Sequence, residues 1–522
     1  MARAGALLLA GAWAWGLPPA QALRTSAGLG HARGDDSAFR VEAWGSDIGD
    51  CRAAPCATLD YAIVQAAPDG VILLGPATFN LSAPVTDPVT IRSEKGAVID
   101  GLFNGSAMIV QADAVLENLR FTNGQADGGA GVRVENSSAA VFRSCHFRRN
   151  VGRLGAGAAI REMARPLFED CTFEHNMAKL DGGAVIVADN AQPTFRRNSF
   201  KNNYAGERGG AVIVMDKAVA VFSATDFFDN GSGEVGGGLF FSNAAGAKFF
   251  SCSVRGNKAR KSGGGVYMAD QAHPTFRSTI ISDNKAGTMG GGLAIWEHAW
   301  PEFQDVSLSN NTAVDGGGVA MGHTVTPVFT GCVLKANKAA NSGGGLLAEG
   351  NATPVLINTT VLANVAQKYG GGFAMTQFAS PQMYNSYLSG NYARRGGGIL
   401  TESGARPVLN GTLIATNAAA TGGGIFSTGL TSSLCKAVGS LYVRSNNASV
   451  AGGGCFFNLD DQVVEMCEGA LRLEKVPMGN IAPAGGGVYW AFPTAADAQE
   501  ENFTSSVRWG FPTAESLEGD FV

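Results

Sequence analysis

Several chemical signatures are missing from this sequence of 522 residues. It has no CxxC pair for a metal, no Ser-His-Asp context, and no glycine loop that leads into a helix for a phosphate. Lys and Arg do not cluster and the net charge is −5, which argues against a nucleic-acid partner. Glycine is abundant, at 72 residues, but it has no three-residue period, so the chain is not collagen-like.

Long apolar runs are also missing after the N-terminus, where no stretch approaches the roughly 20 residues of a transmembrane helix. The first residues, MARAGALLLAGAWAWGLPPAQA, are typical of a secretory signal. Arg3 supplies the charge, Ala6 to Leu17 the apolar core, and Ala20-Gln21-Ala22 the cleavage site. We expect a secreted or cell-surface protein whose mature chain begins at Leu23 and has no membrane span. An N-terminal membrane anchor is the alternative.

Secretion would permit disulfides and glycans. Cys51 and Cys56 lie close in sequence and are the expected pair, while Cys435, Cys455 and Cys467 can supply one more. Ten N-x-[ST] sequons are present, which matter only in a eukaryotic source: Asn80, Asn104, Asn136, Asn230, Asn310, Asn351, Asn358, Asn410, Asn447 and Asn502.

Two markers repeat along most of the chain. Glycine clusters recur every 26 or 27 residues, with the last two intervals longer, and begin at Gly128, Gly155, Gly182, Gly209, Gly236, Gly263, Gly290, Gly316, Gly343, Gly370, Gly396, Gly422, Gly452 and Gly485. An asparagine precedes each cluster by five or six residues: Asn123, Asn150, Asn176, Asn203, Asn230, Asn257, Asn284, Asn310, Asn337, Asn364, Asn391, Asn417, Asn446 and Asn480. Such a period indicates a repeat architecture of about fourteen units.

The residues between the markers favour strands over helices. The apolar runs are short and rich in β-branched and aromatic residues, and glycine interrupts them. The regularly spaced leucines of a leucine-rich repeat are absent. We therefore predict an all-β chain, a single right-handed parallel β-helix with one 26–27-residue coil per repeat.

In a β-helix each marker stacks on its equivalent in the next coil. The first glycine of a cluster, as in Gly236, Gly263 and Gly290, is expected at a corner with positive φ, which glycine adopts without strain. The asparagines, among them Asn203, Asn230, Asn257 and Asn284, are expected to form a buried ladder of side-chain amides. If Asn230 and Asn310 belong to it, both should escape glycosylation.

The repeats resemble those of a known family. FxxN followed about eight residues later by GGA or GGG and an aliphatic residue, as in FEHNMAKLDGGAV and FKNNYAGERGGAV, is similar to the chlamydial polymorphic outer membrane proteins from about Phe121 to Tyr489. The start, CRAAPCATLDYAIVQAAPDGVILLGPATFNL, resembles pectate-lyase-like β-helix proteins. That resemblance implies a capping helix from Thr58 to Ala67 and a first strand in GVILLG. The chain has only about 35 residues after its last glycine cluster, so the outer-membrane family's C-terminal barrel is not carried over.

A nearly continuous acidic column follows the glycine clusters at a fixed distance. It comprises Glu135, Glu162, Asp189, Asp216, Asn243, Asp270, Glu297 and His323. Neighbouring carboxylates about 4.8 Å apart would repel by roughly 1 kcal/mol in water. They either cap strand ends at solvated turns or form a groove for Ca²⁺ or a cationic polymer, although one column alone lacks the six to eight oxygens that Ca²⁺ needs.

The segment WEHAW places Trp296, His298 and Trp300 beside this column, with His323 in the next coil and His273 in the preceding one. Exposed aromatic rings can stack on sugars, so Trp296 and Trp300 are candidate ligand-binding residues; packing at a coil edge is the alternative. Asp270, Glu297, His298 and His323 are the candidate catalytic centre if the protein is an enzyme.

Four cysteines, Cys145, Cys171, Cys252 and Cys332, share one column with small residues, which indicates structural burial. Cys145 and Cys171 lie on adjacent coils, close enough to bridge.

The expected organisation is a signal peptide (1–22), an N-terminal cap with the first coils (23–120), regular repeats (121–424), irregular last coils (425–490) and a tail (491–522). The main functional prediction is an adhesin-like rod, without enzymatic activity, that binds glycans or surface partners along an extended face. The alternatives are a polysaccharide lyase or epimerase acting on an acidic polysaccharide, and a structural wall component. No cofactor is expected unless Ca²⁺ binds the acidic column.

Overall fold

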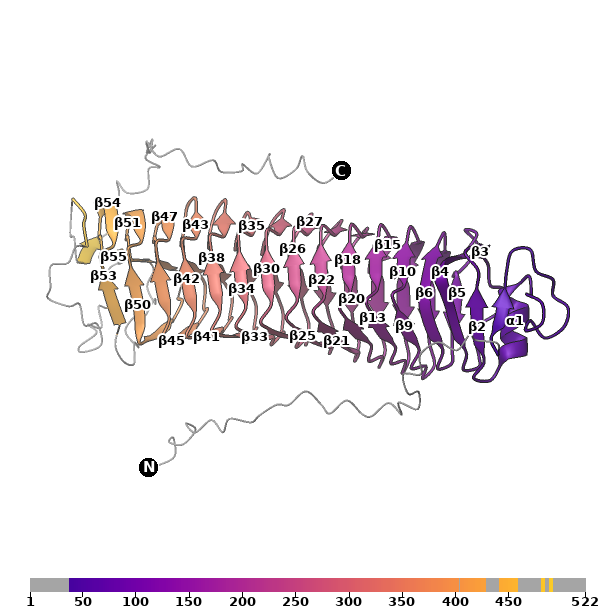
Figure 1. The fold of residues 1–522 in the computed structure, drawn as a ribbon. Helices are drawn as coiled ribbons and strands as arrows, with labels where there is room; N and C mark the ends of the chain where they lie inside the picture. Colours follow the sequence, from indigo (N-terminus) through magenta and orange to yellow (C-terminus); the bar gives the residue numbers. More distant parts are fainter. Residues whose placement is uncertain (1–36, 403, 429–440, 459–479, 484–487, 492–522) are drawn as a thin grey trace, which may run out of the picture.

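The computed structural model describes residues 37–402, 404–428, 441–458, 480–483 and 488–491. In these residues the chain winds into a single straight solenoid of about 13 turns, in which the strands of successive turns are parallel (Figure 1). The predicted all-β architecture of about fourteen coils is confirmed. The last coils and the tail lie largely outside the described residues, as do the predicted signal peptide, Cys435, Cys467, Gly485 and Asn502.

The strands belong to three hydrogen-bonded sheets, which we name A, B and C. Sheet A is 28-stranded and contains two parallel ladders that share β4 and β6. The first ladder is β1 (Phe39–Val41), β2 (Val71–Leu74), β4 (Thr90–Asp100), β6 (Val115–Thr122), β9 (Val141–Arg143), β13 (Leu167–Glu169), β17 (Thr194–Arg196), β21 (Val219–Ser223), β25 (Gly246–Phe250), β29 (Thr275–Arg277), β33 (Glu302–Gln304), β37 (Val328–Thr330), β41 (Val355–Ile357), β45 (Gln382–Tyr384) and β49 (Val408–Asn410). The second ladder joins β3 (Thr78–Phe79) to β4 and β6 and continues through β10 (His146–Arg148), β14 (Thr172–Glu174), β18 (Ser199–Lys201), β22 (Asp226–Phe228), β26 (Ser253–Arg255), β30 (Ile280–Ser282), β34 (Ser307–Ser309), β38 (Val333–Lys335), β42 (Thr360–Leu362), β46 (Tyr387–Ser389), β50 (Thr412–Ala415) and β53 (Leu441–Arg444).

Sheets C and B complete each coil. Sheet C is 13-stranded: β7 (Gln125–Gly128), β11 (Val151–Leu154), β15 (Met177–Asp181), β19 (Tyr204–Ala205), β23 (Gly231–Ser232), β27 (Lys258–Ala259), β31 (Lys285–Ala286), β35 (Thr312–Ala313), β39 (Lys338–Ala339), β43 (Val365–Ala366), β47 (Tyr392–Arg395), β51 (Ala418–Thr421) and β54 (Asn447–Ala451). Sheet B is 15-stranded: β5 (Met108–Val110), β8 (Val132–Val134), β12 (Ala158–Ile160), β16 (Val185–Val187), β20 (Val212–Val214), β24 (Leu239–Phe241), β28 (Val266–Met268), β32 (Leu293–Ile295), β36 (Val319–Met321), β40 (Leu346–Ala348), β44 (Phe373–Met375), β48 (Ile399–Thr401), β52 (Ile425–Thr428), β55 (Cys455–Asn458) and β56 (Val488–Ala491).

Each glycine of a cluster has its own steric reason. The first, such as Gly263, turns the corner between sheets C and B with φ 68°, a conformation that other residues adopt only under strain. A Cβ on the second, Gly264, would lie 2.5 Å from the carbonyl group of Lys285, because the backbone of the next coil passes there. A Cβ on the third, Gly265, would lie 2.7 Å from the carbonyl oxygen of Gly292 and 3.0 Å from Nδ2 of Asn284, so it meets the next coil less closely than a Cβ on Gly264 does.

The third position accordingly admits alanine, as at Ala184 and Ala211, which are both fully buried. The first cluster differs from the prediction, since its corner is Gly129 (φ 64°) and not Gly128. Gly128 is the last residue of β7 and pairs with Leu154 of the next coil, so the corner glycine level with Gly155 is Gly129.

The side-chain amides of the turn between sheet A and sheet C form a continuous buried ladder. In each rung Nδ2 donates to Oδ1 of the next coil's asparagine and to a backbone carbonyl, as Asn257 does to Asn284 (3.0 Å) and to Phe227 (3.0 Å). The backbone N–H of Asn257 also donates to Oδ1 of Asn284, at 3.0 Å. The ladder comprises Asn150, Asn176, Asn203, Asn230, Asn257, Asn284, Asn311, Asn337, Asn364, Asn391, Asn417, Asn446 and Asn480.

Two of the predicted ladder members are wrong. Asn311 occupies the ladder position, while Asn310 stands exposed beside it with φ 55°. Asn123 is likewise in the left-handed region (φ 54°), and the ladder position of that coil is held by Gly124. Left-handed asparagine is well tolerated, so both stand at the turn itself. Asn310 is therefore no longer expected to escape glycosylation. Asn230 is buried in the ladder, so the expectation stands for that residue.

The core between the sheets is filled by columns of aromatic rings. Phe142, Phe168, Phe195 and Phe222 stack with centroids 4.6 to 5.0 Å apart, and a parallel column from Phe121 to Phe227 meets them edge to face. All these rings are fully buried. Truncating one such ring to alanine typically costs about 3–5 kcal/mol, so these columns supply much of the stability.

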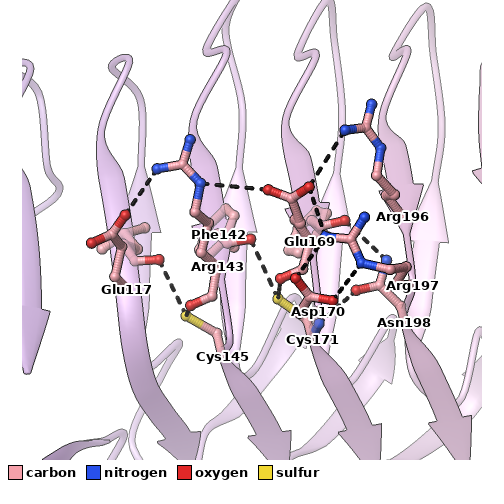
Figure 2. A network of polar contacts seen from close by, with 12 residues as sticks. Glu117, Phe142, Arg143, Cys145, Glu169, Asp170, Cys171, Arg196, Arg197 and Asn198 are labelled. Atoms are coloured by element: carbon pink, nitrogen blue, oxygen red, sulfur yellow. Dashed lines mark hydrogen bonds and ion pairs between the residues drawn. The ribbon is translucent and has the colours of Figure 1, made fainter. Parts of the chain in front are cut away.

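A second polar column lies at the turn between the two ladders of sheet A. Its small side chains donate to the carbonyl of the preceding coil, as Cys145 does to Leu116, Asn198 to Phe168 and Thr359 to Phe329. The cysteines of this column are buried and unpaired, as structural burial predicts (Figure 2). Cys145 and Cys171 lie on adjacent coils but form no disulfide.

The N-terminal end of the core is covered by α1 (Leu59–Ala66), whose Leu59, Ala62 and Ala66 are buried. Thr58 caps this helix by accepting a hydrogen bond from the backbone of Tyr61. The disulfide Cys51–Cys56, with Cα atoms 5.0 Å apart, fixes the adjoining loop. Among the described residues, no helix has the length and apolarity to cross a membrane.

Candidate functional site

The acidic column lies along the turn that follows each strand of sheet B. Asp189, Asp216, Asp270 and Glu297 all have positive φ there, between 57° and 65°. Each carboxylate accepts the backbone N–H of the preceding coil: Asp189 from Glu162 (2.9 Å), Asp216 from Asp189 (3.1 Å) and Glu297 from Asp270 (3.2 Å). Hydrogen bonds of this kind stabilise a carboxylate, so they offset the repulsion between neighbours.

Glu135 does not belong to this column, contrary to the sequence-based prediction. Val134 pairs with Ile160, so the residue level with Glu162 is Asn136, which has φ 62°. The one-residue error has the same origin as the displaced corner glycine of that coil. Glu135 instead forms an ion pair with Arg133 at 2.8 Å.

Asp270 and Glu297 form a coupled pair of carboxyl groups on adjacent coils. The interaction between their carboxyl groups lowers the pKa of Asp270 and raises the pKa of Glu297. Of the two, Glu297 is therefore the group that takes up a proton first as the pH falls. The nearby charge of His298 also lowers the pKa of Asp270, although the ring of His298 is exposed.

Trp296 lies flat against the neighbouring coil. Ile295 points into the core while Trp296 faces outward, as the alternation along β32 predicts. The indole covers Gly322, where a Cβ would collide with the ring. His323 meets Trp296 edge to face, with ring centroids 5.6 Å apart. Much of Trp296 is therefore used in packing within the protein.

Trp300 is the more accessible of the two tryptophans, with 47% of its surface exposed. One face of its indole stacks on His273 of the preceding coil, with centroids 4.5 Å apart and an interplanar angle of 6°. Gly246 lies below His273 and makes room for it, because a Cβ there would stand 3.2 Å from Nε2. The histidines predicted near WEHAW thus contact the tryptophans.

The comparisons with known proteins agree with this geometry. Two stretches, residues 95–233 and 204–334, match the family model described as a right handed beta helix region. The chain folds as a right-handed parallel β-helix. No curated protein matches the chain.

Three partly buried titratable groups near these residues were not found by the sequence-based reasoning. Burial raises the pKa of Tyr267 to about 12, and it also raises the pKa of Asp315 and of Glu349. Asp315 accepts hydrogen bonds from Asn341 Nδ2 and from a backbone N–H, both at 2.9 Å. The repeat pattern did not indicate them, because other coils carry unrelated residues at the equivalent positions.

We call Asp270, His273, Trp296, Glu297, Trp300 and His323 the aromatic–acid cluster. It occupies three successive coils at the edge that follows sheet B. In the described part of the chain, no three His, Cys, Asp or Glu side chains are gathered closely enough to hold a metal ion. What the cluster offers is an exposed aromatic surface beside carboxylates, and one carboxyl group, Glu297, whose pKa is raised.

Proposed function

We propose that the β-helix is a secreted or cell-surface rod that binds glycans at the aromatic–acid cluster without transforming them. The observation that carries this proposal is Trp300, a half-exposed indole held in place by coplanar stacking on His273. The ring is ordered before any ligand arrives, so binding loses little side-chain entropy. Large aromatic surfaces with a polar surround dominate recognition in many interfaces.

Carboxylates beside the indole suit a sugar ligand, because they accept hydrogen bonds from hydroxyl groups. The chain's repeats resemble those of the chlamydial polymorphic outer membrane proteins, which supports an adhesive role. The secretory signal in the sequence supports an extracellular location, and a bridging Ca²⁺ at the acidic column remains part of the proposal.

A second function is favoured by the Asp270–Glu297 pair. Two neighbouring carboxyl groups whose pKa values are shifted in opposite directions are an arrangement that general acid–base catalysis uses. In that case the protein would be a polysaccharide lyase or epimerase, with Glu297 as the acid. The resemblance of the N-terminal segment to pectate-lyase-like proteins supports this alternative.

One experiment separates the two functions. The purified chain is incubated with acidic and neutral polysaccharides, with Ca²⁺ or with chelator, and both retained polymer and unsaturated or epimerised product are measured. We expect retention without product, and we expect Trp300→Ala to weaken retention by about tenfold or more. Phe378→Ala is the matched control, since Phe378 is also an exposed aromatic on a turn after sheet B.

Three results would argue against the binding proposal: no polymer retained by the wild type, equal retention by Trp300→Ala, or equal loss in Phe378→Ala. Product that forms with the wild type and disappears with Glu297→Gln would instead establish the catalytic alternative. If chelator abolishes retention, Ca²⁺ takes part in it.

A further inference from the structure

The outward side of sheet C changes character along the rod. Each coil contributes a short segment to it, from the residue after the ladder position to the residue before the corner glycine. In the five segments from β7 to β23 acidic and basic residues balance, and some pair across coils, as Arg208 does with Asp181 at 2.7 Å. We call these segments the balanced part of sheet C; its charged residues are Arg153, Lys179, Arg208, Asp127, Asp181, Glu207 and Glu234.

The next six segments, from β27 to β47, are strongly basic. The structure describes all their residues, and among these Asp315 is the one acid; its carboxylate accepts hydrogen bonds from Asn341 and from the backbone of Ser342. At one edge, Lys261 pairs with Glu234 of the balanced part at 2.6 Å. We call the bases of these segments the basic strip: Lys258, Arg260, Lys261, Lys285, Lys338, Lys368, Arg394 and Arg395. All eight are at least partly exposed. The turns that lead into these segments carry two more bases and one acid: Arg255, Lys335 and Asp283.

The stacking of coils arranges these bases in rows along the rod. Residues 26 or 27 apart in the sequence become neighbours about 4.8 Å apart, so the bases gather although they form no cluster in the sequence. The first outward residues of successive strands are level in the register of sheet C: Lys258, Lys285, Thr312 and Lys338. A second row stands at the bend before the corner, where the backbone N–H of Arg395 donates to the carbonyl of Lys368 at 2.9 Å. Figure 1 shows β27, β35, β43 and β47 in line along one edge of the rod, so both rows run parallel to its axis for about 24 Å.

The fold does not require bases at these positions. The column that holds Lys258 and Lys285 holds Val151, Met177 and Tyr204 in the balanced part, so it accepts uncharged side chains of different sizes. Ammonium groups about 4.8 Å apart repel by roughly 1 kcal/mol in water, a cost that uncharged residues avoid. The whole chain has a net charge of −5, so the strip does not follow from its composition either. A row of like charges that the fold does not need points to an anionic ligand.

We propose that the basic strip binds a linear acidic polysaccharide that lies along the rod axis. Ammonium and guanidinium groups pair with carboxylate or sulfate groups, and binding releases counterions from the polymer. A sugar residue in an extended polysaccharide is about as long as the distance between neighbouring coils. Acidic groups on successive or alternate sugars can therefore meet bases on successive or alternate coils. This goes beyond glycan binding at the aromatic–acid cluster, because in each coil the strip precedes sheet B and the cluster follows it.

The shape of the strip favours this ligand over other anionic partners. Two rows a few residues apart match a single polymer chain better than the broad surface of an anionic membrane. Single-stranded nucleic acid is usually held by several aromatic rings on which its bases stack. Along the six positions of the first row, all of them described, Tyr392 is the one aromatic residue.

The test measures binding of the purified full chain to immobilised polygalacturonate and dextran sulfate, with neutral dextran as the uncharged reference. We expect both acidic polymers to be bound, with an affinity that falls about tenfold or more between about 50 and 200 mM salt. The double variant Lys258→Glu/Lys338→Glu should weaken binding by at least about tenfold and flatten the salt dependence. Arg153→Glu/Lys179→Glu is the matched control, because it makes the same change of charge on exposed residues of the balanced part. It should bind like the wild type, and circular dichroism checks the fold of both variants.

A wild type that binds neither acidic polymer at about 50 mM salt would overturn the proposal. Equal binding by the strip variant, or an equal loss in the control, would place the contact elsewhere and also overturn it. Tighter binding of single-stranded DNA or of anionic vesicles at the same salt would identify another class of partner, against the proposal. The strip variant should retain neutral polysaccharide like the wild type, because the Trp300 side chain is unchanged in it. Neutral polymer thus reports the aromatic–acid cluster and acidic polymer the strip, so the two proposals can fail separately.

Discussion

Two adjacent asparagines with opposite roles allow a sharp test of the amide ladder. The side chain of Asn311 makes four hydrogen bonds: Oδ1 accepts from the backbone N–H and from Nδ2 of Asn284, and Nδ2 donates to Ile281 and to Asn337. Asn310 stands next to it, exposed, at the left-handed turn. We predict that Asn311→Ala strongly destabilises this coil and that Asn310→Gly does not.

The magnitude follows from the groups left without partners. Removing the Asn311 side chain orphans two buried donors of Asn284, and each such group costs about 1–3 kcal/mol. The carbonyl oxygen of Ile281 and Oδ1 of Asn337 also lose a donor, but each has a second lone pair for another hydrogen bond, so they add less to the loss of stability. We expect a loss of about 2–6 kcal/mol for Asn311→Ala. Asn310→Gly should stay within about 1 kcal/mol, because glycine adopts the same φ without strain.

Urea unfolding followed by tryptophan fluorescence measures this difference, because Trp296 and Trp300 belong to the same coil as Asn311. Repeat proteins can open locally, so native-state hydrogen exchange of the backbone amides of 284 and 311 should accompany it. The reasoning would be refuted if both variants lost the same stability, or if Asn311→Ala lost less than about 1 kcal/mol.

Three further predictions concern other parts of the rod. Gly264→Ala should cost about 2–3 kcal/mol in thermal unfolding and Gly265→Ala about 1 kcal/mol, because a Cβ meets the backbone of the next coil at 2.5 Å at Gly264 and at 2.7 Å at Gly265, and other coils carry a buried alanine at the latter position; equal effects would contradict this. Burial raises the pKa of Glu349, so the folded state binds its proton more tightly than the unfolded state, and this group's contribution to stability falls as pH rises above its ordinary value of 4.5. Glu349→Gln should be more stable than the wild type at pH 7 and show a flatter stability profile above that value; an unchanged profile would count against this. Burial also raises the pKa of Cys171, and Cys145 is fully buried beside it, so neither thiol should react with maleimide until the protein unfolds; labelling of the native state would contradict the packing.

The glycine clusters and the asparagines predicted the fold because each marker serves one steric or hydrogen-bonding purpose in every coil. The errors were of a single residue and arose where the marker itself was ambiguous. Asn310 and Asn311 are identical residues in succession, and only the chain's φ angle decides which of them enters the ladder. The shift at Gly128 came from an additional glycine, since Gly128 stands at the strand position that Leu154 holds in the next coil.

The candidate site was less accessible to sequence reasoning. The acidic column could be predicted from its fixed distance to the glycine clusters, and Glu297 was among the candidate site residues. The stacking of His273 on Trp300 depends on side-chain rotamers, which spacing does not determine. The second polar column was predicted to hold small residues, but its hydrogen bonds were missed. Cys145, Asn198 and Thr359 each donate a hydrogen bond from a short side chain, but they are different residue types, so no sequence motif repeats.

The direction of the hydrogen bonds between coils has a mechanical consequence. The ladder of amides and the strands of all three sheets bond each coil to the next along the rod axis. A pull on the two ends therefore stretches all the bonds of a boundary together, whereas a sideways pull on a terminal strand opens them one after another. If a ligand is bound at Trp300 and one terminus is tethered, a pulling force would act only on the coils between those two points. The rod's resistance to force would thus depend on which end anchors it.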